Sequence, residues 1–74
     1  MRFKLWKVDN DFTMAELARQ LRISVPSLEN IMSGKSWPLA KNAEKIFELT
    51  RGKVTISDLY DEWFLYRRKK ETHG

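Results

Sequence analysis

The chain has 74 residues, no cysteine and a formal net charge of +4. A chain of this length forms at most one domain with a small hydrophobic core, and without cysteine it has neither a disulfide nor a thiolate metal site to stabilise that core. We therefore expect a second copy of the chain to supply part of the stability. The apolar runs are too short for a signal peptide or a membrane span, so we expect a cytoplasmic protein without membrane contact.

The net charge is concentrated in one basic run near the C-terminus. Residues 67–70 read RRKK, and without them the basic and acidic side chains balance. We expect one domain over residues 1–66 and a basic, flexible tail over residues 67–74. A second basic excess lies between residues 19 and 41, where Glu29 is the only acidic residue and the basic residues are Arg19, Arg22, Lys35 and Lys41. Such a concentration is typical of a surface that binds a polyanion.

The N-terminal residues MRFKLWKV alternate only in part between polar and apolar side chains. They fit a short strand, or a helix whose apolar residues are Phe3, Leu5, Trp6 and Val8. We favour the helix because no partner strand is apparent elsewhere in the sequence.

Three further helix starts follow one pattern, in which an apolar residue precedes a hydroxyl residue and a second apolar residue follows five positions after the first. The hydroxyl residues are Thr13, Ser24 and Thr55, which are suited to cap a helix N-terminus. Glu16 and Asp58 complete a capping box after the first and the third. Three repeats of this local pattern in a short chain indicate a largely helical protein.

Apolar spacing predicts helices over residues 14–21, 24–33, about 38–50 and 56 to about 66, with Gly34 and Gly52 ending the second and third of them. The predicted fold is therefore all-α, a compact bundle of five short helices. The side chains that we expect in its core, besides those of the N-terminal helix, are Leu17, Ala18, Leu21, Leu28, Ile31, Met32, Trp37, Leu39, Ala43, Ile46, Phe47, Thr50, Ile56, Leu59, Tyr60, Trp63 and Tyr66.

Only three residues separate the helices predicted over residues 14–21 and 25–33, which suits the tight corner of a helix-turn-helix. The segment FTMAELARQLRISVPSLENIMSGKSWP resembles this motif in the Cro/CI-type repressor family, and AEKIFELTRGKVTISDLY resembles its small Cro-like and YdaS-like members. The matching residues are Thr13, Glu16, Leu17, Ala18, Leu21, Ile23, Ser24, Leu28, Ile31, Gly34, Lys35 and Pro38. The resemblance implies a lambda-repressor-like DNA-binding domain with its helix-turn-helix at about residues 13–34.

Three positions depart from the family pattern. Arg22 lies in the turn where the family usually has Gly, which suits a left-handed backbone. Met14 and Val25 occupy positions where the family often has Gln, so neither donates the hydrogen bond that Gln would give to a phosphate or to adenine.

The resemblance implies that the second helix of the motif lies in the major groove of double-stranded DNA. Val25 and Pro26 would then touch thymine methyl groups and Asn30 would pair with adenine. The full set of expected base contacts is Val25, Pro26, Ser27, Glu29 and Asn30. The expected phosphate contacts are Thr13, Arg19, Arg22, Ser33, Lys35, Ser36, Lys41 and Asn42.

The segment LYDEWFLYRRKKETHG predicts a helix that is apolar on more than one side. A symmetric dimer would cover the extra apolar surface and present two recognition helices to half-sites about one DNA turn apart. The candidate interface residues are Leu59, Tyr60, Trp63, Phe64 and Tyr66. The alternative is that these side chains close the core of a single chain.

These features favour a sequence-specific DNA-binding transcriptional regulator, a dimeric Cro-like repressor from a phage or other mobile element of a bacterium. The alternative is a protein-interaction module with the same fold, such as an antiactivator or an antitoxin-like partner. An excisionase-like architectural factor is disfavoured, because it needs a strand pair where the residues after Gly34 look helical.

Enzymatic function has little support in the sequence. His73 is the only histidine, and neither cysteine nor a Gly-rich phosphate loop is present. Asp61 and Glu62 are adjacent and would point in different directions on a helix, so we interpret them as surface charges. We therefore expect no catalytic residue, no metal and no cofactor.

Overall fold

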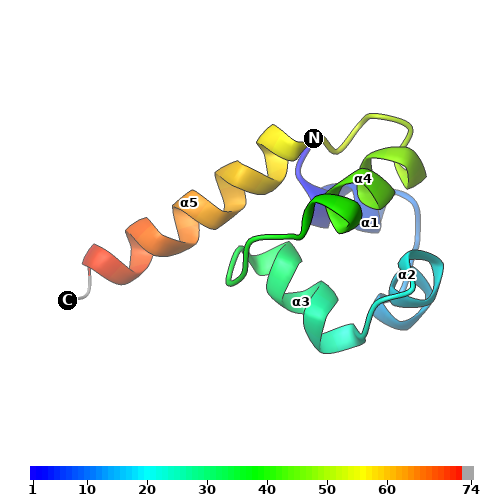
Figure 1. Cartoon of the computed structure of the whole chain (residues 1–74), viewed down its shortest axis with the longest axis horizontal. Coiled ribbons are helices and arrows are strands. Elements are labelled where there is room, and N and C mark those ends of the chain that lie inside the picture. The colour runs from blue at the N-terminus through cyan, green and yellow to red at the C-terminus, as the bar shows by residue number, and fades with distance from the viewer. Residues whose placement is uncertain (73–74) are drawn as a thin grey trace.

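The computed structural model describes the backbone of residues 1–72 and the side chains of residues 1–69. All regular structure in this part of the chain is α-helical, which confirms the predicted all-α class (Figure 1). The helices are α1 (Phe3–Asp9), α2 (Met14–Leu21), α3 (Val25–Ser33), α4 (Ala40–Leu49) and α5 (Ile56–Thr72). The N-terminal segment is thus a helix, as predicted, and not a strand.

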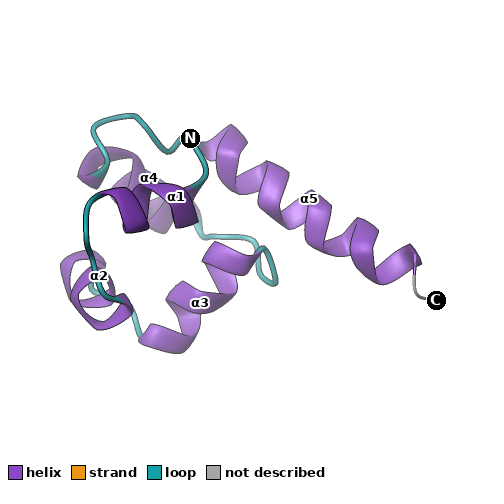
Figure 2. Ribbon diagram, turned by 180° about the vertical axis from the view of Figure 1, so that it is seen from behind, coloured by secondary structure: helices purple, strands orange, loops and turns teal. Residues whose placement is uncertain are grey.

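Helices α1 to α4 gather in one group, and α5 runs along its side and extends past it (Figures 1 and 2). Helix α2 packs against α3 and α4, and α5 packs against the same two helices. Helix α3 therefore lies between α2 and α5, which hold its two flanks.

The predicted capping residues all cap their helices. In α2 the Glu16 amide donates to Thr13 Oγ1 over 3.1 Å, and the Thr13 amide donates back to the Glu16 carboxylate over 3.2 Å. Ser24 accepts from an amide in the first turn of α3. In α5 the Asp58 amide donates to Thr55 Oγ1 over 3.2 Å, and the Thr55 amide donates to Asp58 Oδ2 over 2.8 Å. These local bonds set where each helix begins.

The core is formed by one cluster of apolar side chains from all five helices and from the segment that precedes α5. All six of the predicted members on α2 and α3 are confirmed. The buried apolar residues are Phe3, Trp6, Leu17, Ala18, Leu21, Leu28, Ile31, Met32, Ala43, Ile46, Val54 and Leu59.

Seven predicted core residues are instead exposed. Their exposed fractions lie between 44% for Trp37 and 62% for Leu39, and the others are Leu5, Val8, Phe47, Ile56 and Tyr60. Helix α4 begins at Ala40, so Leu39 is its N-cap and lies outside the regular helical face. Successive residues of a helix point about 100° apart, so Phe47 turns outward beside buried Ile46, and Tyr60 does so beside Leu59.

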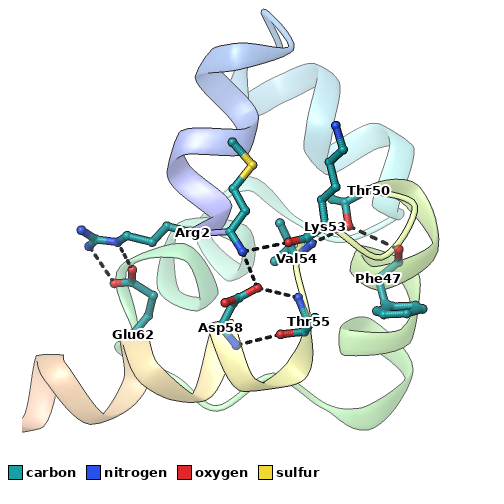
Figure 3. A network of polar contacts seen from close by, with 9 residues as sticks. Arg2, Phe47, Thr50, Lys53, Val54, Thr55, Asp58 and Glu62 are labelled. Atoms are coloured by element: carbon teal, nitrogen blue, oxygen red, sulfur yellow. Dashed lines mark hydrogen bonds and ion pairs between the residues drawn. The ribbon is translucent and has the colours of Figure 1, made fainter.

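Glu62 was predicted to be a surface charge, and this prediction is wrong. Only 9% of the residue is exposed, because Glu62 follows Leu59 by three positions and shares its inward face. Its carboxylate pairs with the guanidinium of Arg2, through Nε to Oε1 and through Nη2 to Oε2 over 3.2 Å (Figure 3). The paired charges explain how a carboxylate is tolerated at this depth.

A second polar network joins the N-terminus to the start of α5 (Figure 3). The Met1 ammonium group donates to the Lys53 carbonyl over 2.9 Å and to Asp58 Oδ2 over 2.8 Å. Burial opposes ionisation of Asp58, yet the ammonium group and the Thr55 bonds hold the pKa of this carboxyl below its ordinary value. The ionised Asp58 therefore stabilises the contact between α5 and the N-terminus above that pKa.

Helix α5 does not end near Tyr66, as its apolar spacing predicted, but continues to Thr72. Arg67 belongs to the helix, where its guanidinium lies 3.9 Å from the centre of the Trp63 ring and donates to the carbonyls of Gly34 and Lys35. Of the predicted flexible tail, residues 67–72 are thus helical, and residues 73–74 lie outside the described residues.

Gly34 is the position where the fold depends most on glycine. A Cβ atom there would lie 2.1 Å from the Glu62 carbonyl oxygen of α5, and its φ is +85°. Gly52 also has a positive φ, +80°, but a Cβ there would meet only the Phe47 ring, at 3.3 Å. An alanine at either position would have to adopt a strained left-handed backbone conformation. Only the alanine at position 34 would also force the loop after α3 away from the backbone of α5.

We therefore expect Gly34→Ala to lower the free energy of unfolding by about 1–3 kcal/mol more than Gly52→Ala does. Urea unfolding followed by circular dichroism measures both values. Equal losses in the two variants would contradict the close packing of α5 on the end of α3.

Candidate nucleic-acid interface

The corner between α2 and α3 is held by backbone and side-chain bonds. Arg22 ends α2 in a left-handed conformation with φ 57° and ψ 45°, the geometry expected for this turn. The Ile23 amide donates to the Ala18 carbonyl over 3.1 Å, and Lys45 Nζ of α4 donates to the Leu21 carbonyl over 3.2 Å. The lysine thus satisfies an end carbonyl of α2 and ties the corner to α4.

Helix α3 buries one face and exposes the other. Leu28, Ile31 and Met32 lie in the core, and Ala18 of α2 is 3% exposed. The small Ala18 side chain lets the two helices approach closely. The outward side chains of α3 are all small or polar, namely Pro26, Ser27, Glu29, Asn30 and Ser33.

Val25, a predicted base contact, has a divided role. It is half-buried and packs against the core, as does Met14 at the start of α2. Part of the Val25 side chain therefore stabilises the N-terminal end of α3, and only the remainder is open to a ligand.

Two of the four basic side chains predicted to contact phosphate, Arg22 and Lys35, lie close to the two ends of α3. Arg19 and Arg22 lie at the corner before α3, and Lys35 follows its C-terminus; Lys41 lies in the first turn of α4, and all four are exposed. Helix α3 has nine residues. At 1.5 Å per residue, such a helix is about 13 Å long. Arg22 and Lys35 therefore lie near the two ends of a short outward face.

The remaining predicted phosphate contacts are less uniform. Ser33 and Thr13 are exposed, whereas Ser36 and Asn42 are half-buried, and Asn42 Oδ1 is buried without a hydrogen-bond partner in the described part of the chain. Hydrogen bonds from Thr13 lower the pKa of the neighbouring Glu16 carboxyl. The resulting negative charge makes Thr13 a poorer neighbour for phosphate than the four basic residues.

Two residues missed by the sequence reasoning complete this surface. A hollow of about 490 Å³ beside the C-terminal end of α3 is lined by Asn30, Lys35, Ser36, Tyr66 and Arg67. Tyr66 was assigned to a dimer interface and Arg67 to a flexible tail. The available signal was the four-residue spacing of Trp63 and Arg67, which places both on one face of a helix that continues past residue 66.

The predicted dimer residues divide into buried and exposed ones. Leu59 is 1% exposed and cannot meet a second chain, which corrects its assignment; Trp63 and Tyr66 are half-buried. Tyr60 and Phe64 are exposed, with ring centres 6.3 Å apart.

A larger apolar surface surrounds Tyr60 and Phe64. The Trp37 ring lies 5.2 Å from Tyr60, and Phe47 and Ile56 line a further hollow between α4 and α5. We call the following set the aromatic surface: Trp37, Leu39, Phe47, Ile56, Tyr60 and Phe64. Contiguous apolar surfaces of this kind often mark a site where a protein binds a partner.

Comparisons with models of known protein families, with curated proteins and with solved structures find no match to this chain. Within residues 1–72, none of the helices combines the length and the hydropathy that crossing a bilayer requires. The described side chains include no cluster of three or more residues that could ligate a metal.

The left-handed backbone conformation of Arg22 allows a test of whether its side chain contributes to the stability of the corner. Arg51, in the loop before α5, is a matched position, with φ 53° and an exposed side chain. Because glycine adopts this conformation without steric cost, we expect Arg22→Gly and Arg51→Gly each to raise the free energy of unfolding by up to about 1 kcal/mol. Thermal and urea unfolding measure the change. A loss of stability in Arg22→Gly would show that the arginine side chain supports the corner.

Proposed function

We propose that this protein is a sequence-specific, double-stranded DNA-binding regulator in which α2, the corner at Arg22 and α3 form a helix-turn-helix. The observation that carries the proposal is the outward face of α3, with small and polar side chains between basic residues at both ends. An α-helix of this kind fits the major groove of B-DNA, where base edges carry a distinguishable pattern of donors and acceptors.

The side chains of α3 suit this reading of bases. The Asn30 amide can pair with adenine, and Pro26 offers an apolar contact to a thymine methyl group. Ser27 is partly engaged, since its amide donates to Ser24 Oγ over 3.2 Å and its hydroxyl oxygen accepts from the Ser24 hydroxyl over 2.8 Å. Glu29 is repelled by phosphate and is compatible with the groove where it meets a cytosine amino group. Readout therefore rests mainly on Pro26 and Asn30.

A second copy of the chain is the proposed cover of the aromatic surface. Its six side chains expose between 44% and 62% of their area. Since a large aromatic side chain presents about 150–250 Å², this corresponds to roughly 600 Å² of apolar surface. A stable interface buries about 800 Å² per partner, so the aromatic surface would form most of one. A symmetric dimer would occupy a partly palindromic operator and occlude a promoter.

Selection of genomic DNA fragments with the purified protein tests the proposal. We expect one enriched motif with two-fold symmetry, bound at least about 10³ times more tightly than random DNA at physiological salt. Asn30→Ala should cost about 1–3 kcal/mol and relax the preference at one base pair, whereas Lys41→Ala should weaken binding to all sequences alike.

The matched arginine pair supplies the control. Arg22→Gly should weaken DNA binding although it does not destabilise the fold, whereas Arg51→Gly should bind as the unchanged protein does. Equal affinity for selected and random DNA would refute sequence-specific regulation.

The size of the aromatic surface favours a second candidate, a module that binds a different protein. Sedimentation equilibrium distinguishes whether a second copy of the chain or a different protein covers the aromatic surface. If a second copy covers the surface, the chain is a dimer at micromolar concentration and Phe64→Ser shifts it toward monomer, whereas Leu5→Ser, at an exposed apolar position of α1, does not.

If the chain remains monomeric at these concentrations, the proposed dimer is refuted and the second candidate is favoured. Charge reversal of Arg22 and Lys35 to Glu would then distinguish the functions, because it should abolish DNA binding and leave capture of a protein partner intact.

A further inference from the structure

The hollow beside the end of α3 is lined by hydrogen-bond donors from two distant parts of the chain. Asn30, Lys35 and Ser36 come from α3 and the loop after it, and Tyr66 and Arg67 come from α5. Amide, ammonium, hydroxyl, phenol and guanidinium groups all donate hydrogen bonds, and the ammonium group of Lys35 and the guanidinium group of Arg67 also attract anions by their positive charge. No carboxylate is among the described residues that line the hollow.

Arg67 is fixed at the wall of this hollow by three hydrogen bonds. Its Nη1 atom donates to the carbonyls of Gly34 and Trp63 over 3.0 and 3.3 Å, and Nη2 donates to the Lys35 carbonyl over 3.1 Å. These bonds leave the Nε donor and one N–H of Nη2 unengaged within the described part of the chain. Arg67 therefore retains both charge and donors for a ligand.

The wall is rigid as well as charged. The Trp63 ring lies under the guanidinium, 3.9 Å from its carbon, and is held in turn against Trp37, with ring centres 5.6 Å apart. Gly34 brings the backbone of the loop against that of α5. A side chain that is ordered before binding loses little conformational entropy when the ligand arrives.

We propose that this hollow binds a single phosphate group of the DNA backbone, held between Lys35 and Arg67. This inference rests on the proposed function and adds α5 to the DNA-contacting surface. Asn30 belongs both to the outward face of α3 and to the hollow, so the bound phosphate would flank the groove that α3 enters. Planar guanidinium groups and ammonium groups are the side chains that bind phosphate best.

Salt dependence of duplex binding tests the proposal. Lys35→Ala removes one cation and keeps the carbonyl that Arg67 holds, Arg67→Gln removes the other, and Arg51→Ala is the matched control for the loss of one positive charge. We expect each of the first two to weaken binding about tenfold for selected and random duplexes alike. Because both meet one phosphate, the double variant should lose less than the product of the two effects.

The slope of log affinity against log salt should fall by about 0.9 in the double variant, the value for one phosphate contact, and should be unchanged in Arg51→Ala. If Lys35→Ala, Arg67→Gln and the double variant had the same salt slopes and affinities as Arg51→Ala, the proposal would be overturned. Should Arg67→Gln unfold, the comparison of Lys35→Ala with Arg51→Ala decides, since Lys35→Ala leaves in place the backbone carbonyl to which Arg67 donates.

Inorganic phosphate is the second arm of the test, read by tryptophan fluorescence because Trp63 lies under Arg67. Saturation by millimolar inorganic phosphate that Lys35→Ala abolishes, together with an unchanged duplex slope, would assign the hollow to a free anion and overturn the DNA assignment. The two proposals can also fail separately. If the protein prefers no sequence, but the double variant shows the expected change of slope on random duplexes, the proposed function is refuted and the phosphate site is supported.

Discussion

The close approach of Gly34 to the backbone of α5 is the contact on which the arrangement of the functional surface depends. It ends α3 in a left-handed turn and places the following carbonyls within reach of Arg67. The guanidinium then satisfies carbonyls at the end of α3, where a positive charge is also favourable for the helix dipole. Gly34 and Arg67, together with the Arg2–Glu62 and Met1–Asp58 pairs, thus hold α5 where it leaves the helical group. Figure 1 shows the direction in which it leaves.

The fold was predictable where the signals are local. The caps of α2, α3 and α5 depend on residues within one turn of each other, and their hydrogen bonds are present as the sequence indicated. The inward faces of α2 and α3 follow from spacing alone, because each helix has one clear apolar stripe. The left-handed turn at Arg22 was expected from the resemblance, in which Gly usually occupies this position, and not from its residue type.

The errors arise where a position depends on distant partners. Glu62 is buried because Arg2, 60 residues away in the chain, neutralises it. Helix α5 extends past Tyr66 because Arg67 finds carbonyls in the loop after α3, which no periodicity of α5 encodes. The hollow escaped prediction for the same reason, since its two walls are separated by about half of the chain. Exposure of Phe47 and Tyr60 reflects a small core that is filled by their neighbours.

Helix α5 carries Tyr60 and Phe64 of the aromatic surface and, farther along the same helix, Arg67 of the hollow, so the two sites are joined by one helix. On the proposed function, this makes self-association and DNA binding thermodynamically linked. If dimerisation raises the affinity for DNA by some factor, DNA must raise the affinity of the two chains for each other by the same factor. The occupied fraction of an operator would then rise more steeply with protein concentration than simple one-to-one binding allows.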